Sequence, residues 1–219
     1  MFKRRINALS FILHSVAAGL SIAVGGYAFL SVESRYLGAF LFSLGLYVVC
    51  QYKIPLYTGR IAYLGRPGGY RASRLALMLA CNLIGAAAVG LLFVPVAGGV
   101  DVVALMQKKL SALPHEIFIR GLFCGMIVFL AVDIAGRFQD PFGRYLGVLI
   151  GVPAFILAGF EHCIADMFYL AAAWKLGLAF EAGGQLGFLM LVILGNSLGA
   201  LLLNLMMPQP PRGDSKGEN

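Results

Sequence analysis

Three ionisable side chains interrupt an apolar stretch of this sequence, and their types and spacing suit proton or anion chemistry. Glu161, His162 and Asp166 lie within residues 159–168, which read GFEHCIADMF. An ionisable side chain at bilayer depth costs on the order of 2.5–3.5 kcal/mol on insertion scales, so it persists mainly where a pathway or pocket requires it. A histidine, with an unperturbed pKa of about 6.5, can exchange a proton near neutral pH. The segment is therefore the first candidate for a functional site.

The composition indicates what surrounds this segment. Of the 219 residues, 60% are apolar and 12% are charged, against roughly 25% charged in a soluble domain, and the mean hydropathy is +0.85. Six apolar runs reach the ~20-residue length that crosses a bilayer, at residues 7–31, 36–58, 75–98, 117–135, 142–174 and 186–207. We therefore predict an all-α membrane protein with six transmembrane helices, in which no soluble catalytic or nucleic-acid-binding domain fits.

The net charge of +7 follows from membrane topology and does not require a nucleic-acid partner. With the N-terminus inside the cell, the inside segments carry most of the basic residues: Lys3, Arg4, Arg5, Arg60, Arg66, Arg71, Arg74, Arg137, Arg144, Arg212 and Lys216. The outside loops carry only Arg35, Lys108, Lys109 and Lys175. Basic residues favour the cytoplasmic side, and an even number of spans returns the chain to that side. We expect a multi-pass protein of the cell (inner) membrane with both termini cytoplasmic.

The two halves of the chain, about residues 7–98 and 115–207, resemble each other. Sliding one along the other aligns residues 36–38 with 145–147 and Lys53 with His162 at a shift of 109, and Asn82 with Asn196 at a shift of 114. Because each half has three spans, the second half must enter the membrane in the opposite direction. Such an inverted 3+3 repeat is typical of transporters and channels whose site lies near the membrane midplane.

Spans two and five are predicted to be interrupted. Pro55, which follows Lys53 closely, lacks the backbone donor that a helix interior needs. Span five is longer than a simple transmembrane helix, contains Pro153 and carries the polar segment near its centre. Broken helices at membrane depth are tolerated only where protein or a water-filled cavity surrounds the freed backbone groups. We expect the two interruptions to face one common pathway.

These strings resemble a known family. The segment 159–168 is similar to the fifth-helix motif of the formate/nitrite transporter family, channels for small monovalent anions. Four shorter strings support the resemblance: LYTG at 56–59 with the loop in helix two, NLIG at 82–85 with helix three, RGLFC at 120–124 with helix four, and GN at 195–196 with helix six. The resemblance implies an aquaporin-like six-helix protomer, assembled as a homopentamer with one pore in each protomer. It also implies a single transmembrane channel domain over residues 1–210, with a short cytoplasmic tail at 211–219.

The resemblance also implies roles for single residues. His162 would be the histidine at the pore centre, and Thr58, in the loop of helix two, would face it. Leu46, Leu56 and Phe155 would form apolar constrictions on either side of that centre.

The remaining site residues include departures from the family pattern. Asn196 matches a polar position of the sixth helix. Asp166 replaces an asparagine, and because positions i and i+4 of a helix share a face, we expect it to touch His162 and favour the charged histidine. Lys53 is assigned to the pore centre by the repeat, and Gly125 replaces an asparagine of the fourth helix. The alternatives are that Lys53 extends to an interface and that Asp166 caps a helix or pairs locally.

These residues predict transport. A bare anion in an apolar constriction faces a large desolvation penalty, which is avoided by neutralising it. We expect proton-linked movement of small monovalent weak-acid anions, such as formate, nitrite or hydrosulfide, across the lipid bilayer, with the proton coming from His162 or from water reached through it. The alternative is an aquaporin-type pore for a small neutral solute or weak base.

An enzyme is not expected, and neither is a cofactor. A metal site needs three or four protein ligands, and no second histidine lies at helical spacing from His162. Four cysteines occur within the spans without metal-type spacing, so we interpret them as free thiols: Cys50, Cys81, Cys124 and Cys163.

Overall fold

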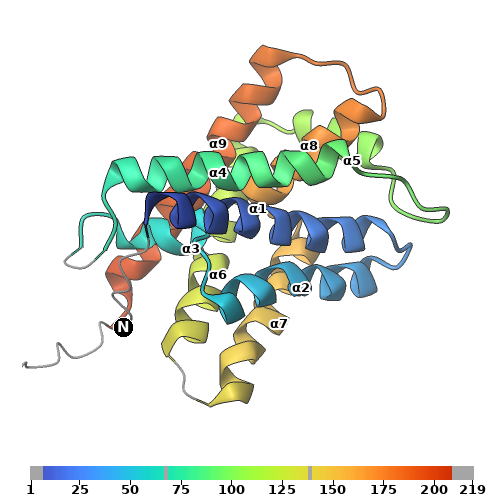
Figure 1. Cartoon of the computed structure of the whole chain (residues 1–219). Coiled ribbons are helices and arrows are strands. Elements are labelled where there is room, and N and C mark those ends of the chain that lie inside the picture. Colours follow the sequence, from blue (N-terminus) through green and yellow to red (C-terminus); the bar gives the residue numbers. More distant parts are fainter. Residues whose placement is uncertain (1–6, 67–68, 138–139, 209–219) are drawn as a thin grey trace, which may run out of the picture.

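The computed structural model describes residues 7–66, 69–137 and 140–208 (Figure 1). Its regular elements, in order, are α1 (Ala8–Leu30), α2 (Arg35–Tyr52), α3 (Tyr57–Arg60), η1 (Ile61–Tyr63), α4 (Ala72–Leu91), α5 (Val102–Leu110), α6 (Pro114–Arg137), α7 (Pro141–Ala158), α8 (Cys163–Lys175) and α9 (Ala182–Met206). Apart from an isolated bridge between Leu64 and Tyr70, the regular structure of these residues is helical. The expected tail at 211–219 lies outside the described residues, as do the basic residues Lys3, Arg4, Arg5, Arg212 and Lys216.

Six membrane spans account for most of the fold. By length and composition α1, α4, α6 and α9 can each cross a bilayer. The other two spans are bent pairs: α2 meets the segment Tyr57–Tyr63 at 52°, and α7 meets α8 at 55°. The interruption of helices two and five is thereby confirmed, as is the all-helical class. Pro153 lies inside α7 without ending it, and the break comes later, at Gly159.

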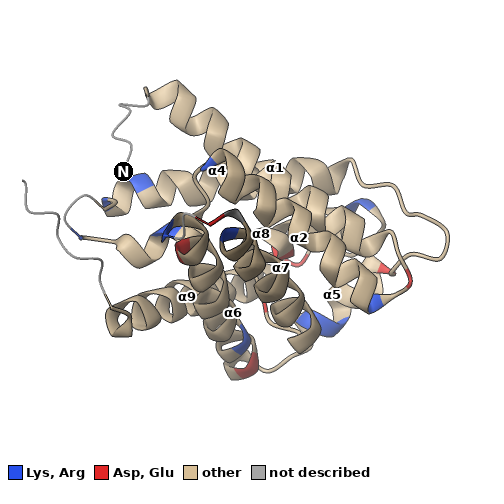
Figure 2. Cartoon of the chain, turned by 90° about the horizontal axis from the view of Figure 1, so that it is seen from below, with Lys and Arg blue, Asp and Glu red and all other residues tan. Residues whose placement is uncertain are grey.

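The outward surface of the spans is apolar. Large hydrophobic side chains are exposed along α1 and α9, among them Leu9, Leu13, Leu20, Val24, Leu194, Leu198 and Leu202. The ribbons of α1 and α9 carry no charged residue, and charges elsewhere lie mainly toward helix ends and connecting segments (Figure 2). Soluble monomers rarely expose apolar patches of this extent. The pattern is that of a multi-pass membrane protein.

The two halves have the same helix arrangement. α1 packs against α2 and α4, as α6 packs against α7 and α9. The short helices after the breaks are exchanged between the halves: α8 packs on α1 and α4, and α3 packs on α6 and α9. In Figure 1, α1 and α4 run side by side above the segment that carries α3. The inverted repeat is therefore built so that each half completes the other.

In each half of the repeat, a glycine allows two helices to approach each other closely. A Cβ on Gly19 of α1 would lie 2.0 Å from the backbone oxygen of Asn82 on α4. A Cβ on Gly125 of α6 would lie 2.1 Å from the backbone oxygen of Asn196 on α9. Side-chain carbons do not come so near to backbone atoms, so both positions require glycine. Gly125, one of the departures from the family pattern, thus has a packing reason.

Gly125→Ala is expected to destabilise the protein, because the added methyl group must push α6 away from α9. Overpacking of a close-packed interior costs about 1–3 kcal/mol, which we expect as a lower melting temperature of the purified protein in detergent. Gly136→Ala, on the same helix, is the matched control: a Cβ there meets nothing within 4 Å. Its melting temperature should be unchanged or higher, since alanine favours helix. Equal melting temperatures for the two variants would contradict the packing role of Gly125.

Candidate functional site

The two breaks have the same backbone course. α2 ends at Lys53 (φ 54°) and α7 ends at Gly159 (φ 72°), both in the left-handed conformation. A short extended segment follows, and the next helix begins after an N-cap residue, Leu56 before α3 and His162 before α8. A lysine in the left-handed conformation is unusual, since glycine adopts it at lower cost. The left-handed residue is needed because the helix axis changes direction at each break within a few residues.

Asn82 of α4 holds the first break. Its Oδ1 accepts from the backbone N–H of Tyr57 at 2.8 Å, the first residue of α3. Its Nδ2 donates to the carbonyl oxygens of Pro55, at 3.0 Å, and Ser15, at 2.6 Å. A break in the membrane interior frees backbone groups that must find partners within the protein. One buried amide side chain supplies two of those partners, and its third hydrogen bond ties the break to α1.

Asn196 of α9 holds the second break in the same way. Its Oδ1 accepts from the backbone N–H of Cys163 at 3.0 Å. Its Nδ2 donates to the carbonyl oxygens of Glu161 and Gly121, each at 2.8 Å. The asparagines are 114 residues apart, as the sequence predicted. Their partners, however, are 106 residues apart in each case: Tyr57 and Cys163, Pro55 and Glu161, and Ser15 and Gly121.

The ring of His162 is held by two hydrogen bonds. Nδ1 accepts from the backbone N–H of Ala165 at 3.3 Å, as an N-cap of α8. A backbone N–H only donates, so Nδ1 carries no hydrogen and the neutral ring carries it on Nε2. Nε2 therefore donates to Oγ1 of Thr58, 3.0 Å away. Thr58 is fully buried and His162 is 3% exposed, so this bond joins α3 to α8 inside the protein.

Apolar side chains surround this pair. The ring of Phe155 stacks on that of His162, with centroids 5.9 Å apart, and Phe42 meets Phe155 edge to face at the same distance. Leu46 and Leu56 are buried in the same core. The three residues expected to form constrictions are thus all interior. Phe42 was not predicted, although it lies one turn before Leu46 on the same face of α2.

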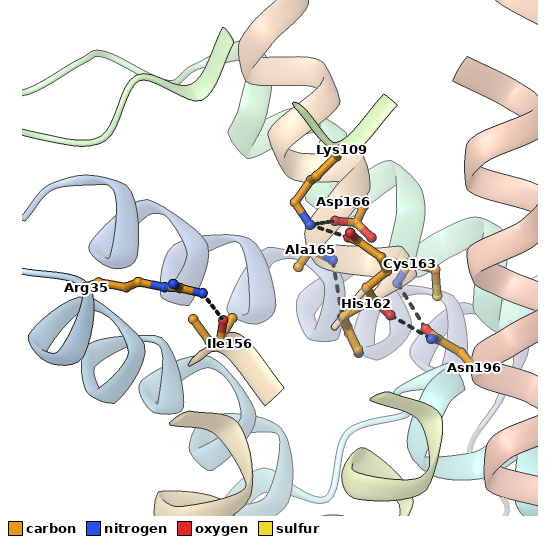
Figure 3. Close-up of polar contacts among 9 residues, drawn as sticks. Arg35, Lys109, Ile156, His162, Cys163, Ala165, Asp166 and Asn196 are labelled. Atoms are coloured by element: carbon orange, nitrogen blue, oxygen red, sulfur yellow. Dashed lines mark hydrogen bonds and ion pairs between the residues drawn. The ribbon is translucent and has the colours of Figure 1, made fainter. Parts of the chain in front are cut away.

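A buried ion-pair cluster includes Glu161, the residue that precedes His162. Nζ of Lys109, on α5, contacts Oδ1 of Asp166 at 3.0 Å and also pairs with Glu161. The Lys109 side chain is 15% exposed, and the two carboxylates are 2% exposed or less. Burial lowers the pKa of the Lys109 ammonium, but the charges of Asp166 and Glu161 outweigh burial and hold the pKa above its ordinary value. Figure 3 shows Lys109 and Asp166 pointing toward one another, apart from His162.

A further cation binds the carbonyl groups at the end of α7. Arg35, at the start of α2, donates to the carbonyl oxygen of Leu157 at 2.9 Å. It also donates to the carbonyl oxygen of Ile156 at 3.4 Å (Figure 3). The last carbonyl groups of a helix lack intrahelical partners and carry a partial negative charge, so a guanidinium is well suited to them. Arg35 thus supports the end of α7, and Asn196 supports the start of α8.

The comparisons with known proteins agree with this geometry. The profile of the formate/nitrite transporter family matches residues 1–209. The chain belongs to the formate/nitrite transporter family. It is 28% identical to the nitrite transporter NirC of Escherichia coli (strain K12), over 91% of this chain and 82% of NirC.

Solved structures share the family fold. An FNT family ion channel superposes with a TM-score of 0.81 at 25% identity, over 91% of this chain and 89% of that one. A pentameric formate channel with formate bound gives 0.79 at 23% identity, over 93% and 97%. The six-span inverted repeat is therefore the fold of the formate/nitrite transporter family.

In this member of the family, one expected contact of the site is absent. Asp166 was expected to touch the ring of His162, but its carboxylate reaches Lys109 instead. The rule that positions i and i+4 share a face holds within a helix, and His162 is an N-cap with an extended backbone (φ −116°, ψ 111°). Its side chain therefore points away from the face that carries Asp166. Asp166 instead forms an ion pair with Lys109, 57 residues away in the sequence, which neither expectation included.

The placement of Lys53 opposite His162 was wrong. The hydrogen bonds at the two breaks give a shift of 106, so Lys53 corresponds to Gly159, and Leu56 corresponds to His162. The Lys53 side chain is exposed at the end of α2. The shift of 109 followed matching apolar letters, which carry little information about register in membrane helices.

Lys109 is the residue that the sequence reasoning missed as part of the site. It had been assigned only to an outside loop. A signal was nevertheless present: Val102, Met106 and Lys109 recur at i, i+4 and i+7, and the first two are the buried residues of α5. Lys109 therefore continues the inward face of this short helix.

Proposed function

We propose that this protein transports small monovalent weak-acid anions, of the formate and nitrite type, along a route that passes Thr58 and His162. The observation that carries the proposal is the buried Thr58–His162 hydrogen bond, which joins the first turns of two broken helices from opposite halves of the repeat. Sites near the midplane at broken helices are typical of inverted-repeat transporters. Membership of a transporter family supports the class of function.

The chemistry of the pair suits an anion. The N-terminal end of α8 carries a partial positive charge that favours negative groups. The neutral ring presents N–H at Nε2 to Thr58, and this leaves the Thr58 hydroxyl hydrogen able to donate to an anion oxygen. Leu46, Leu56 and Phe155 would make the flanks apolar, so the anion crosses them as its neutral acid.

We propose that His162 stays neutral while it caps α8. Protonation of Nδ1 would remove the hydrogen bond that this atom accepts from the backbone N–H of Ala165, and the two N–H groups would then point at each other. It would also add a positive charge at a helix N-terminus, which is unfavourable. His162 then acts as a fixed donor, and the proton that neutralises the anion comes through water or another group.

Assembly and location belong to the same proposal. A homopentamer is supported by the likeness to a structure described as a pentameric formate channel. The cell (inner) membrane with both termini cytoplasmic is supported by the distribution of basic residues. One transmembrane channel domain would cover residues 1–210, and the function requires neither a catalytic step nor a cofactor.

The test is a flux assay in proteoliposomes with formate, nitrite, hydrosulfide, acetate and lactate at several pH values. Thr58→Val and His162→Phe are each expected to lower anion flux at least tenfold, because each removes a donor from the proposed route. His115→Phe is the matched control, since His115 is exposed at the start of α6. Undiminished flux in both Thr58→Val and His162→Phe would rule out this route.

A binding measurement complements the flux assay. Thr58 is the only threonine of the 219 residues, so a threonine isotope label reports this one position. We expect added formate to shift the single threonine resonance. The alternative function, a pore for a small neutral solute or weak base, would instead give solute flux that is indifferent to pH and no shift with formate.

A further inference from the structure

The cluster of Lys109, Glu161 and Asp166 has more carboxylates than cations. One ammonium group lies between two carboxyl groups that are each 2% exposed or less. Within the described residues, Oδ2 of Asp166 is a buried atom without a hydrogen-bond partner. If both carboxyl groups were ionised, the cluster would hold a net charge of −1 away from water.

A net buried charge is avoided by taking up a proton. Two carboxyl groups that share one site lose their protons in separate steps, because the first negative charge opposes the second. Lys109 can compensate for one of them. Asp166 lies in the first turn of α8, where the helix dipole favours a negative charge, but this contribution is small beside the burial of a charge. One bound proton on the carboxyl pair would make the cluster neutral.

The neighbouring groups do not supply a second cation. Besides the cluster, the titratable groups that face Asp166 in the described residues are Tyr169 and Cys163 of α8 and Cys124 of α6. The Lys109 ammonium lies 5.8 Å from the Tyr169 ring centroid. Of the helices packed on α8, α9 has no titratable side chain, and the charged or basic groups of α1 and α4 lie elsewhere: His14 beside Ser10 and Arg74 over Phe11. On α5, which also packs on α8, the Lys108 side chain is exposed.

The cluster is directly linked to the site proposed above. Glu161 precedes His162 in the chain, and its carbonyl is held by Asn196. The backbone N–H of Asp166 donates to the carbonyl oxygen of His162 at 2.8 Å. The cluster is therefore connected through the backbone to the residue that carries the ring. His162, whose Nδ1 is occupied as a cap, is not itself the group that stores the proton.

From this we infer that the Lys109–Glu161–Asp166 cluster is a proton-binding site that controls the approach of anions to His162. With one proton bound, the cluster is neutral and an anion reaches the Thr58–His162 pair. When the proton is lost, the net negative charge repels the anion. The effect on transport rests on the proposed function, whereas the binding of a proton rests on the geometry of the cluster.

The decisive variant is Asp166→Asn, which removes one carboxyl group with little change of size. Lys109 and Glu161 then balance at every pH. We expect anion flux at about pH 8 to rise about tenfold, so that the pH profile becomes shallower and keeps only the pH dependence that comes from neutralising the anion. Glu161→Gln is the matched variant: it makes the same change of charge from the other carboxyl group and should flatten the profile equally. Unchanged pH profiles in both variants would overturn the control of anion approach.

Infrared difference spectroscopy tests the proton directly, without transport. Wild-type protein is expected to show the C=O stretching band of a protonated buried carboxyl group that disappears as pH rises, and either variant should lack it. Absence of this band from wild type at every pH overturns the proton site. Absence of anion flux from wild type at every pH overturns the proposed function instead, while the band still decides whether the cluster binds a proton.

Discussion

Replacing Lys109 with methionine is expected to lower the free energy of unfolding by about 3–5 kcal/mol, the largest single effect that we expect in this protein. Methionine keeps the length of the side chain but leaves Glu161 and Asp166 buried without a cation. Removing one partner of a buried ion pair costs this amount because the remaining charge is uncompensated. Thermal unfolding of the purified protein in detergent should show a melting temperature lower by at least about 6 °C.

Lys108→Met is the control for this experiment, because Lys108 directly precedes Lys109 on α5 and its side chain is exposed. A change of exposed charge is expected to stay within about 0.5 kcal/mol. The loss of unfolding free energy in the Lys109 variant should become smaller as the pH falls, since protonation removes the unpaired negative charges. The triple variant Lys109→Met, Glu161→Gln, Asp166→Asn should regain most of the stability. A Lys109 variant as stable as the Lys108 variant would refute the buried pairing.

Asn196→Ala is expected to lower the free energy of unfolding by about 2–4 kcal/mol and to abolish anion flux. The change removes three hydrogen bonds and leaves the N–H of Cys163 and the carbonyl groups of Glu161 and Gly121 without their partner. Unsatisfied buried backbone groups cost about 1–3 kcal/mol each in water-soluble proteins, and less in membrane proteins. Flux should be lost because these bonds fix the start of α8, and with it the ring of His162.

The repeat offers a stringent comparison. Asn82→Ala should give a similar loss of stability, because Asn82 makes the same three kinds of bond at the first break. Leu194→Ala, two residues before Asn196 and 53% exposed on α9, serves as the control and should retain both stability and flux. Retention of wild-type flux by Asn196→Ala would mean that the second break is held by other contacts.

The fold was predictable from the sequence because its main determinants are local. Apolar runs of bilayer length set the six spans, and the polar segment at 159–168 marks the break between α7 and α8. The pair Asn82 and Asn196 was aligned correctly, since two polar letters in apolar helices are rare enough to fix a register. Apolar residues that face lipid can replace one another, so matching apolar letters do not fix a register. For that reason the alignment of Lys53 with His162 was three residues off.

The site was harder to predict because its contacts join distant segments. The contact between Thr58 and His162 was expected from family resemblance, and the structure brings them to 3.0 Å. The partner of Asp166 was not expected, since Lys109 lies 57 residues away on a helix of nine residues. The role of Gly125 was likewise hidden, because the backbone of α9 that approaches it has no signature in the sequence of α6.

The exchange of the short helices between the halves determines the order in which the site can form during synthesis. α3 leaves the ribosome before α6 and α9, the helices on which it packs, have been made. Asn82 can close the first break early, but the Thr58 hydroxyl has no histidine until α8 follows. The first half alone therefore lacks both the helices on which α3 packs and the histidine that pairs with Thr58. The Thr58–His162 pair gains its support from Asn196 only when the last span has been made.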